Sequence, residues 1–493
     1  MAAARRVSEP LWTAASAAGA AAGRSIGDWN AYGVSIDSRN IAEGDLFIAL
    51  RGPSNDGHRF AADALGRGAA AAMVDHMPEG APADAPLLLV KDTQAGLEAL
   101  GIAARARTGA RIIAVTGSAG KTGSKEMLRT ALGRQARCHA SEASYNNLWG
   151  VPLSLARMPR ATEFGVFEIG MNHSGEITPL TKFVRPHAAI VTTIAPAHIG
   201  NFKSLAEIAD AKAEIFLGLA PGGVAIINQD SDHYELMARR AQDAGAAQVL
   251  GFGSAPGAAA RLVKAVHHAD CSCVYAEIYG QPLTYKIGFS GAHWVMNSLA
   301  VLAAIRVLGG DLALATIALA GMSPLDGRGR RHYLPVPGGH FTLIDESYNA
   351  NPASMQAALS NLSALTIEGR GRRIAVLGDM AELGDDTARY HRDLGRVIEK
   401  GRVQLTFTAG PQMQMLHDAL PVNLRGAHAD SSGALIAPLR EELRAGDIVV
   451  VKGSYSSSMG KIVKALLARE EADGKIGSLA DQAPGREDDW DAV

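Results

Sequence analysis

The stretch from Arg111 to Leu132 constrains the fold of this chain more than any other part of the sequence. It begins with the apolar run Ile112 to Val115, which is typical of a strand buried on both faces. A small-residue loop, Gly117-Ser118-Ala119-Gly120, comes next. Lys121-Thr122 then opens a segment with apolar residues at helical spacing: Met127, Leu128, Ala131 and Leu132. A strand, a glycine loop and a helix in this order indicate a phosphate-binding site on an α/β sheet.

The residue types of the loop suit a nucleoside triphosphate. Glycines let backbone N–H groups close on phosphates, and the N-terminus of the helix adds a partial positive charge. Lys121 can reach the outer phosphates, and Thr122 can hold Mg²⁺. Val115 stands where the usual P-loop has its first glycine, so the motif has the shorter form G-x-x-G-K-T. We predict an ATP site built from Gly117, Ser118, Ala119, Gly120, Lys121 and Thr122.

Length and composition bound the rest of the chain. At 493 residues it is too long for one core, and we expect three α/β domains, at 1–108, 109–325 and 326–493. Lys and Arg number 48 against 50 Asp and Glu, so no basic field suggests a nucleic-acid partner. The 3 cysteines lack zinc-site spacing and read as reduced cytoplasmic thiols. Arg5-Arg6 before an Ala-rich stretch mimics a signal peptide, but without a strong apolar block we expect a surface helix and no membrane insertion.

Two further polar residues follow strands of the central domain. Glu168 lies near the end of the expected strand Phe164 to Ile169, and His198 follows the expected strand Ala188 to Ile194. Ligands of open α/β sheets bind outside the carboxyl ends of the strands, where Thr122 also lies. A single histidine is more often structural, but three candidates at one sheet edge favour a metal–nucleotide site.

Lys212 falls on the apolar stripe of the helix that Ser204 and Glu207 open as a capping box, a stripe formed by Leu205, Ile208, Ile215, Phe216 and Leu219. Most such lysines extend to water or pair with a carboxylate. The alternative is a desolvated amine with a lowered pKa. The sequence pattern leaves both interpretations open.

The outer domains carry polar loops after short strands. In the first domain, Ser38-Arg39 suits an anionic ligand, although these residues alone favour ordinary turn chemistry. Beyond a Gly- and Arg-rich hinge at Gly321 to Arg331, three apolar strands each lead into a polar loop: Phe341 to Ile344, Ile374 to Leu377 and Ile448 to Val451. This pattern predicts a Rossmann-like sheet. The acidic tail beyond Arg469 is expected to fray.

With these loops assembled, the chain resembles the Mur ligase family over roughly residues 26 to 468. The shortened P-loop is that family's form. D-S-R, G-D-L-F-I-A-L-R-G and D-G-H resemble its uridine-nucleotide domain, while S-Y-N-A-N-P and G-D-M-x-E-L-G resemble the member that adds D-alanyl-D-alanine. The D-N-P-R signature of the diaminopimelate-adding relative is absent from the sequence.

The resemblance implies an ATP-dependent cytoplasmic ligase of peptidoglycan precursor synthesis. It would join D-Ala-D-Ala to UDP-N-acetylmuramoyl-tripeptide through an acyl phosphate, and we expect a monomer. It also implies roles for individual residues: Thr122 and Glu168 on one Mg²⁺, His198 on a second, Lys212 as a carbamylated lysine, Asn297, Arg328 and Asp345 as nucleotide contacts, and Ser38 and Arg39 on the UDP-substrate.

Several positions depart from the family pattern: Ser144, Thr193, Trp294, Glu346 and Tyr455. The departures spare the expected metal ligands and Lys121, so activity is expected, with adenine and acceptor contacts most affected. The alternatives are another Mur-type or folylpolyglutamate-type ligase, or a nucleotide-binding protein without turnover. The third residue of the tripeptide cannot be read from the sequence.

Overall fold

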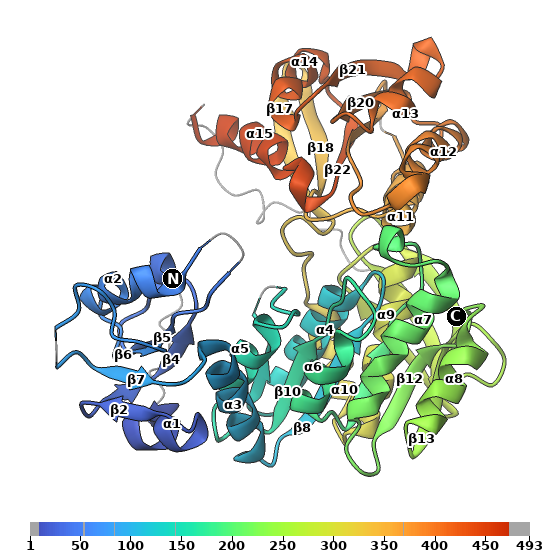
Figure 1. Cartoon of the computed structure of the whole chain (residues 1–493). Coiled ribbons are helices and arrows are strands. Elements are labelled where there is room, and N and C mark those ends of the chain that lie inside the picture. Colours follow the sequence, from blue (N-terminus) through green and yellow to red (C-terminus); the bar gives the residue numbers. More distant parts are fainter. Residues whose placement is uncertain (1–8, 53–54, 83, 143, 368, 473–493) are drawn as a thin grey trace, which may run out of the picture. The chain divides into compact units, whose positions relative to one another are not determined.

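The computed structural model describes residues 9–52, 55–82, 84–142, 144–367 and 369–472 (Figure 1). The chain divides into two compact units, Met1–Ser323 and Pro324–Val493, and the division falls inside the predicted hinge. Arg5-Arg6 and the tail after Ala472 lie outside the described residues. The tail was predicted to fray beyond Arg469, but its first residues, 470–472, belong to a helix, α15 (Gly460–Ala472). No helix of the described chain is both long and apolar enough to span a membrane.

The first unit begins with a small α/β sheet of five strands in the order β2-β7-β6-β5-β4. Strands β4 to β7 are parallel and β2 is antiparallel to β7. The strands are β2 (Arg24–Ile26), β4 (Gly33–Ser35), β5 (Asp45–Ile48), β6 (Ala71–Val74) and β7 (Leu87–Leu89), and a separate pair joins β1 (Trp12–Thr13) to β3 (Asn30–Ala31). The helices are α1 (Ala14–Ala20), α2 (Ala61–Gly66) and α3 (Thr93–Ala106). The Ala-rich stretch thus forms a helix, with Ala14 and Ala17 buried.

The second sheet of this unit has nine strands in the order β16-β15-β14-β13-β12-β11-β8-β10-β9. It is parallel from β9 to β14 and antiparallel through β15 and β16. This agrees with the prediction of a mostly parallel sheet for the central domain. The strands are β8 (Arg111–Thr116), β9 (Cys138–Ala140), β10 (Phe164–Glu168), β11 (Ala188–Val191), β12 (Val224–Asn228), β13 (Gln248–Gly253), β14 (Ala260–His267), β15 (Ser272–Ile278) and β16 (Gln281–Ile287).

Helices cover both faces of this sheet (Figure 1). One core joins it to α4 (Lys121–Gly133), α9 (Ala292–Val307) and α10 (Leu312–Ala320). The other core joins it to α5 (Gly150–Ala156), α6 (Ile177–Val184), α7 (Leu205–Ala213) and α8 (Tyr234–Asp243). Because both faces are buried, the central strands are nearly all apolar, and this is why β8 was recognisable.

Helix α5 also belongs to the core of the small sheet. Its Leu153 and Ala156 pack with Trp12 and Leu97, and the Trp12 indole Nε1 donates to the Ala156 carbonyl at 2.9 Å. Arg157 donates from Nε to the Val34 carbonyl at 2.6 Å. These contacts therefore join the small sheet to α5, a helix that comes after the predicted P-loop in sequence.

The second unit is a six-stranded sheet in the order β17-β18-β22-β19-β20-β21, parallel except for the edge strand β17. Its strands are β17 (Arg330–Val336), β18 (Gly339–Glu346), β19 (Arg373–Gly378), β20 (Leu405–Ala409), β21 (Arg425–Ala429) and β22 (Ile448–Lys452). Its helices are α11 (Pro352–Ala364), α12 (Thr387–Lys400), α13 (Gln414–Ala419), α14 (Ile436–Glu442) and α15 (Gly460–Ala472). The three strands predicted from the sequence are β18, β19 and β22.

Two local predictions were wrong. The stripe from Leu205 to Leu219 is not one helix, because α7 ends at Ala213 and a 3₁₀ segment, Glu214–Gly218, follows. Glu214 turns away from the helix to accept hydrogen bonds from the backbone N–H groups of Gly175 and Thr178 at the start of α6. The capping box is also only half formed, since the Glu207 carboxylate accepts from the N–H of Lys203 rather than from that of Ser204.

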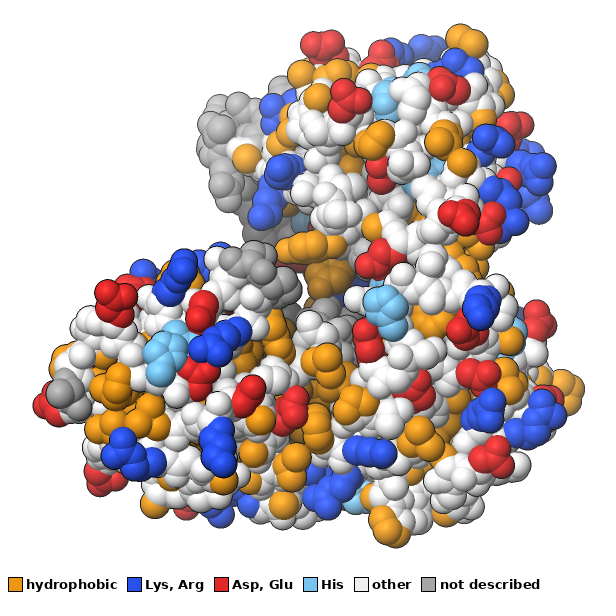
Figure 2. All heavy atoms as spheres, in the orientation of Figure 1, with side chains coloured by type: hydrophobic (Ala, Val, Ile, Leu, Met, Phe, Trp, Pro, Cys, Tyr) orange, Lys and Arg blue, Asp and Glu red, His pale blue; other side chains and the backbone are white. Residues whose placement is uncertain are grey.

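The surface mixes both signs of charge. On the face drawn in Figure 2, basic and acidic side chains are interspersed over both units rather than gathered in one field. Cys138, Cys271 and Cys273 are all free thiols, as predicted.

Candidate active site

The P-loop forms as predicted between β8 and α4. Gly117 and Gly120 adopt positive φ angles of 147° and 81°. A Cβ atom at Gly117 would come within 1.9 Å of the Thr192 Oγ1, and one at Gly120 within 2.5 Å of the Asn297 Nδ2. Both positions therefore require glycine for conformation and for space.

The chain after β11 supports this loop. The Ser118 N–H donates to the Thr193 carbonyl at 2.8 Å, and the Ser118 hydroxyl bonds to the backbone of Ala195. The Thr192 hydroxyl donates to the Ala119 carbonyl at 2.5 Å. Strand β11 was predicted to continue to Ile194, but it ends at Val191 because the next residues turn to hold the loop. Thr193, which departs from the family pattern, contributes its backbone carbonyl to this contact with the P-loop. The contact therefore does not depend on which side chain stands at position 193.

Lys121 and Thr122 occupy the first turn of α4. The Lys121 ammonium donates to the Gly117 carbonyl at 2.8 Å, so the side chain folds back over the loop. The Thr122 hydroxyl lies 2.8 Å from the Glu168 Oε2, and the other carboxylate oxygen accepts from the Asn146 Nδ2 at 2.7 Å. Glu168 at the end of β10 is only 1% exposed.

This pair of oxygens fits a magnesium ion. Mg²⁺ prefers oxygen ligands at about 2.1 Å in octahedral geometry, so adjacent ligands lie about 3 Å apart. The Thr122 hydroxyl and the Glu168 carboxylate have this chemistry and this spacing. The structure thus brings together the two residues that were predicted to share a Mg²⁺.

His198 lies on the same connection that supports the P-loop, three residues after Ala195. It has a left-handed backbone, with φ of 57° and ψ of 24°, directly before a 3₁₀ turn at Ile199–Asn201. A non-glycine residue in this region is uncommon and is retained where the surroundings fix it.

Lys212 neither extends to water nor pairs with a carboxylate among the described residues, and it is only 2% exposed. Burial lowers the pKa of its ammonium group well below the ordinary value, and the positive charge of Lys121 lowers it further. The second effect places the two amines within electrostatic reach of each other. Of the two interpretations of the sequence, the structure therefore agrees with the desolvated amine.

Asn297 lies on α9 against the P-loop, 7% exposed and close to Gly120. Trp294, one of the departures, is part of the core beneath. Its ring stacks on Phe289 at 4.3 Å between centroids and meets α4 at Gly123, where a Cβ would come within 2.5 Å of the indole. The tryptophan therefore fills the space between α9 and α4.

In the small sheet, Ser38 and Arg39 lie on a 3₁₀ turn after β4. The Asp37 carboxylate caps this turn and accepts two hydrogen bonds from the Arg39 guanidinium, both at 2.8 Å. This guanidinium lowers the pKa of Asp37 to about 2. The Arg39 side chain is 83% exposed, so its guanidinium is accessible to solvent while Asp37 fixes its position.

The second unit holds the remaining predicted residues. The buried Asp345 at the end of β18 accepts from the Gly327 N–H at 2.8 Å and from the Ser347 hydroxyl at 2.6 Å. The Arg328 guanidinium lies 4.2 Å from the centroid of the Tyr348 ring. The departure Glu346 forms an ion pair with the buried Lys452 at 3.3 Å.

Tyr455, the departure that follows β22, is 77% exposed, and its ring lies 6.2 Å from that of Tyr348. Tyr348 and Tyr455 therefore form an aromatic pair at the carboxyl edge of the sheet in the second unit.

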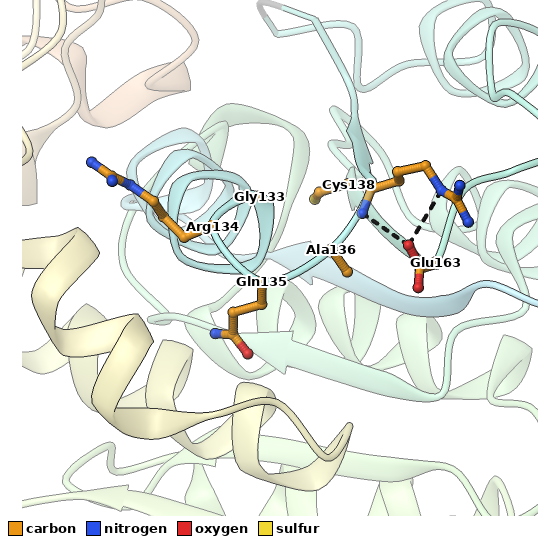
Figure 3. A pocket seen from close by; sticks show the side chains of 7 residues that line it. Gly133, Arg134, Gln135, Ala136, Cys138 and Glu163 are labelled. Carbon is orange, nitrogen blue, oxygen red and sulfur yellow. Dashed lines mark hydrogen bonds and ion pairs between the residues drawn. The ribbon is translucent and has the colours of Figure 1, made fainter.

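A hollow at the opposite end of α4 is separate from this chemistry (Figure 3). Its lining runs from Gly133 to Cys138 and includes Glu163, which accepts from the Arg137 backbone at 3.1 Å. It lies at the amino ends of the parallel strands, and burial raises the pKa of the Cys138 thiol to about 12. Neither feature suits phosphate binding or thiol catalysis at neutral pH.

Sequence reasoning missed two residues that build the site, Asn146 and Thr192. Asn146 lies two residues after Ser144, and no role was predicted for it. Thr192 acts through the backbone carbonyl of Ala119, and such a contact leaves no residue pattern to detect.

Curated relatives match nearly the whole chain. The UDP-N-acetylmuramoyl-tripeptide–D-alanyl-D-alanine ligases of Bacillus subtilis and Escherichia coli are each 33% identical, covering 88% of this chain and 93% of theirs. The solved structure of MurF from Acinetobacter baumannii is 28% identical, with a TM-score of 0.80 over 93% of this chain and 99% of that one. The ADP complex of a MurF ligase from Thermotoga maritima shares the fold, with a TM-score of 0.75.

The P-loop, the paired oxygens of Thr122 and Glu168 and the second α/β unit define the class of this protein, an ATP-dependent amide ligase. Family models match three successive parts: the Mur ligase catalytic domain at 30–108, the middle domain at 115–305 and the glutamate ligase domain at 329–455. The chain belongs to the Mur ligase family.

Proposed function

We propose that the chain joins D-Ala-D-Ala to UDP-N-acetylmuramoyl-tripeptide with consumption of ATP, in peptidoglycan precursor synthesis. The observation that carries this proposal is the whole-length similarity to ligases named for this reaction, together with a P-loop site built from matching residues. The geometry accounts for the nucleotide chemistry, and the similarity supplies the acceptor and the donor.

In the proposed reaction, the terminal carboxylate of the tripeptide attacks the γ-phosphorus of ATP and displaces ADP. The amine of D-Ala-D-Ala then attacks the acyl phosphate, releasing phosphate and forming the amide. The first step brings an anion against a polyanion, so fixed positive charge must offset the repulsion. Lys121 supplies such a charge at the P-loop, and the N–H groups at the start of α4 add partial positive charge.

Bound Mg²⁺ supplies further neutralisation of phosphate charge and orients the phosphates. Thr122 and Glu168 would hold one ion, and we assign His198 to a second. Asn146 fixes one Glu168 oxygen and so leaves the other directed to Thr122.

We further propose that Lys212 is carbamylated and acts beside His198. Two observations support this: the amine is buried without a described carboxylate partner, and its pKa is lowered well below the ordinary value by burial. A neutral amine can add CO₂, and the product is an anion. That anion would be attracted by the positive charge of Lys121, which disfavours a second positive charge at Lys212.

The remaining assignments are proposals of the same kind. Asn297, Arg328 and Asp345 would contact the nucleotide, and Ser38 and Arg39 the UDP-substrate. The domains would span 1–108, 109–325 and 326–493. We also propose a cytoplasmic location, which the free cysteines would suit, and a monomer.

Phosphate release tests the function. The purified protein should release phosphate only when ATP, UDP-MurNAc-tripeptide and D-Ala-D-Ala are all present, and diaminopimelate and lysine tripeptides should be compared. Release with other amino-acid acceptors but not with D-Ala-D-Ala would indicate a sister ligase of this family. ATP binding without release under all conditions would contradict a ligase.

A further inference from the structure

Lys125 is a buried lysine that the nucleotide chemistry does not use. It lies one helical turn after Lys121 on α4, and its side chain is 0% exposed. Burying an ammonium group is costly unless it is paired and hydrogen-bonded, so an apolar residue would be the simpler filling for this position. The Lys125 Nζ pairs with the Glu126 Oε1 at 2.9 Å and donates to the Ser141 carbonyl at 2.7 Å.

Neutralising Glu126 does not by itself explain this lysine. The Glu126 carboxylate also accepts from the Arg129 Nε at 2.7 Å, and Arg129 is half exposed on the same helix. A local ion pair is therefore present without Lys125. Lys125 in addition donates to the carbonyl of Ser141, which directly follows β9.

Ser141 stands directly against the backbone of Glu168. It is 1% exposed, its N–H donates to the Val166 carbonyl at 3.0 Å, and its hydroxyl accepts from the Glu168 N–H at 3.4 Å. Lys125 thus binds the carbonyl of Ser141, while the N–H and the hydroxyl of Ser141 contact β10, the strand that carries Glu168.

The connection between β9 and α5 returns to Glu168 at Asn146. The Asn146 side-chain amide donates to the Glu168 Oε1, and the Asn146 backbone carbonyl accepts from the Gly170 N–H at 2.7 Å. The fit is close, since a Cβ at Gly170 would come within 2.8 Å of the Asn146 Cγ. A small displacement of this connection would therefore change how Asn146 holds the carboxylate.

We propose that Lys125 is a positioning residue of the magnesium–nucleotide site. It anchors Ser141 to α4 beside the backbone of Glu168, and so keeps the Glu168 carboxylate in place between Asn146 and Thr122. Contacts lead from α4 through Lys125 and Ser141 to the backbone of Glu168. The Glu168 carboxylate, which Asn146 also holds, leads back to Thr122 on α4. The proposal rests on the proposed function only for the identity of the ligand, Mg²⁺ with an adenine nucleotide.

ADP binding measured by calorimetry, with Mg²⁺ and with EDTA, separates positioning from mere packing. Mg²⁺ should increase the affinity of the wild type for ADP. In Lys125→Met this increase should be about tenfold smaller, while the affinity for ADP in EDTA stays within about twofold of the wild-type value. Arg129→Ala, the matched control on the same helix, should keep the full tightening. Asn146→Ala should reproduce the loss, and the double variant Lys125→Met/Asn146→Ala should lose little more, because both changes act on one link.

A folded Lys125→Met variant with wild-type Mg²⁺ tightening would overturn the proposal, as would strict additivity with Asn146→Ala. If Lys125→Met does not fold, Lys125→Arg provides the same test. Arginine places a larger guanidinium at this fully buried position, so Ser141 should shift and the effect of Mg²⁺ on ADP affinity should fall, whereas an undiminished effect would refute the idea. Failure of the proposed ligase function would show separately, as absent phosphate release by a wild type that still binds Mg²⁺ and ADP.

Discussion

The charge state of Lys212 can be measured through stability, without any assumption about catalysis. In the folded protein this amine is buried, and its pKa is lowered well below 10.5. In the unfolded chain it has its ordinary value. Between the two pKa values the unfolded state binds one proton more than the folded state. The stability of the wild type must therefore rise with pH across this window. Lys212→Met has no such proton and retains the length and the apolar contacts of the stem.

The magnitude follows from one proton. Linkage allows a slope of at most about 1.4 kcal/mol per pH unit for a single group. At pH 7 the variant should be more stable than the wild type, because the wild type must give up a proton on folding. Between pH 7 and pH 9 the advantage should shrink by up to roughly 3 kcal/mol. In a protein of this size such a change corresponds to several degrees in melting temperature.

The assay is a series of calorimetric melts of both proteins at matched pH in CO₂-depleted buffer, so that carbamate formation does not intervene. Melting temperatures are compared as differences, since a chain with two compact units need not unfold in a single step. Adding bicarbonate should stabilise the wild type alone. A difference that stays constant from pH 7 to pH 9 would refute the reasoning, because it would mean that Lys212 keeps its proton on folding.

Three further predictions concern the substrates. Lys121→Ala should lower turnover by about 10³-fold with an unchanged melting temperature, since the lysine acts on phosphate charge, and turnover within tenfold of wild type would contradict this role. Arg39→Ala should raise the KM for the UDP-substrate by about five- to tenfold and spare the KM for ATP, because the residue lies on the small sheet; equal weakening of both would contradict the assignment. Thr192→Val should weaken ATP binding about tenfold by releasing the Ala119 carbonyl, and titration of ADP should show it even without Mg²⁺.

The alternation of strands and helices could be predicted because it depends on burial. Strands such as β8 and β22 are covered on both faces, so their apolar runs stand out in the sequence. The end of α7 at Ala213 could not be predicted in this way. It depends on Glu214 reaching the start of α6, a contact across 36 or more positions of sequence that leaves the local pattern helical.

The site could be predicted where a residue both follows a strand and carries its own chemistry. Thr122 and Glu168 meet both conditions, and the structure places their oxygens 2.8 Å apart. Ser118 was assigned to the ATP loop from its place in the motif. In the structure its hydroxyl is hydrogen-bonded to the backbone of Ala195. A motif fixes which residues form a loop, and only the packed structure shows whether each side chain faces the ligand or the scaffold.

The two buried lysines show where the sequence stops being informative. Lys125 and Lys212 both interrupt the apolar side of a helix beside the nucleotide loop, and both are at most 2% exposed. Lys125 reaches the carboxylate of its neighbour Glu126 and the carbonyl of Ser141, so this buried amine is paired and hydrogen-bonded. Lys212 has no described carboxylate partner and lies within the field of Lys121, so burial acts on it without compensation. The same residue type in the same kind of position therefore links two elements through its contacts in one case, and in the other it is an amine whose pKa burial lowers. Only the acceptors around each amine, which come from distant parts of the chain or from the backbone, decide between these outcomes.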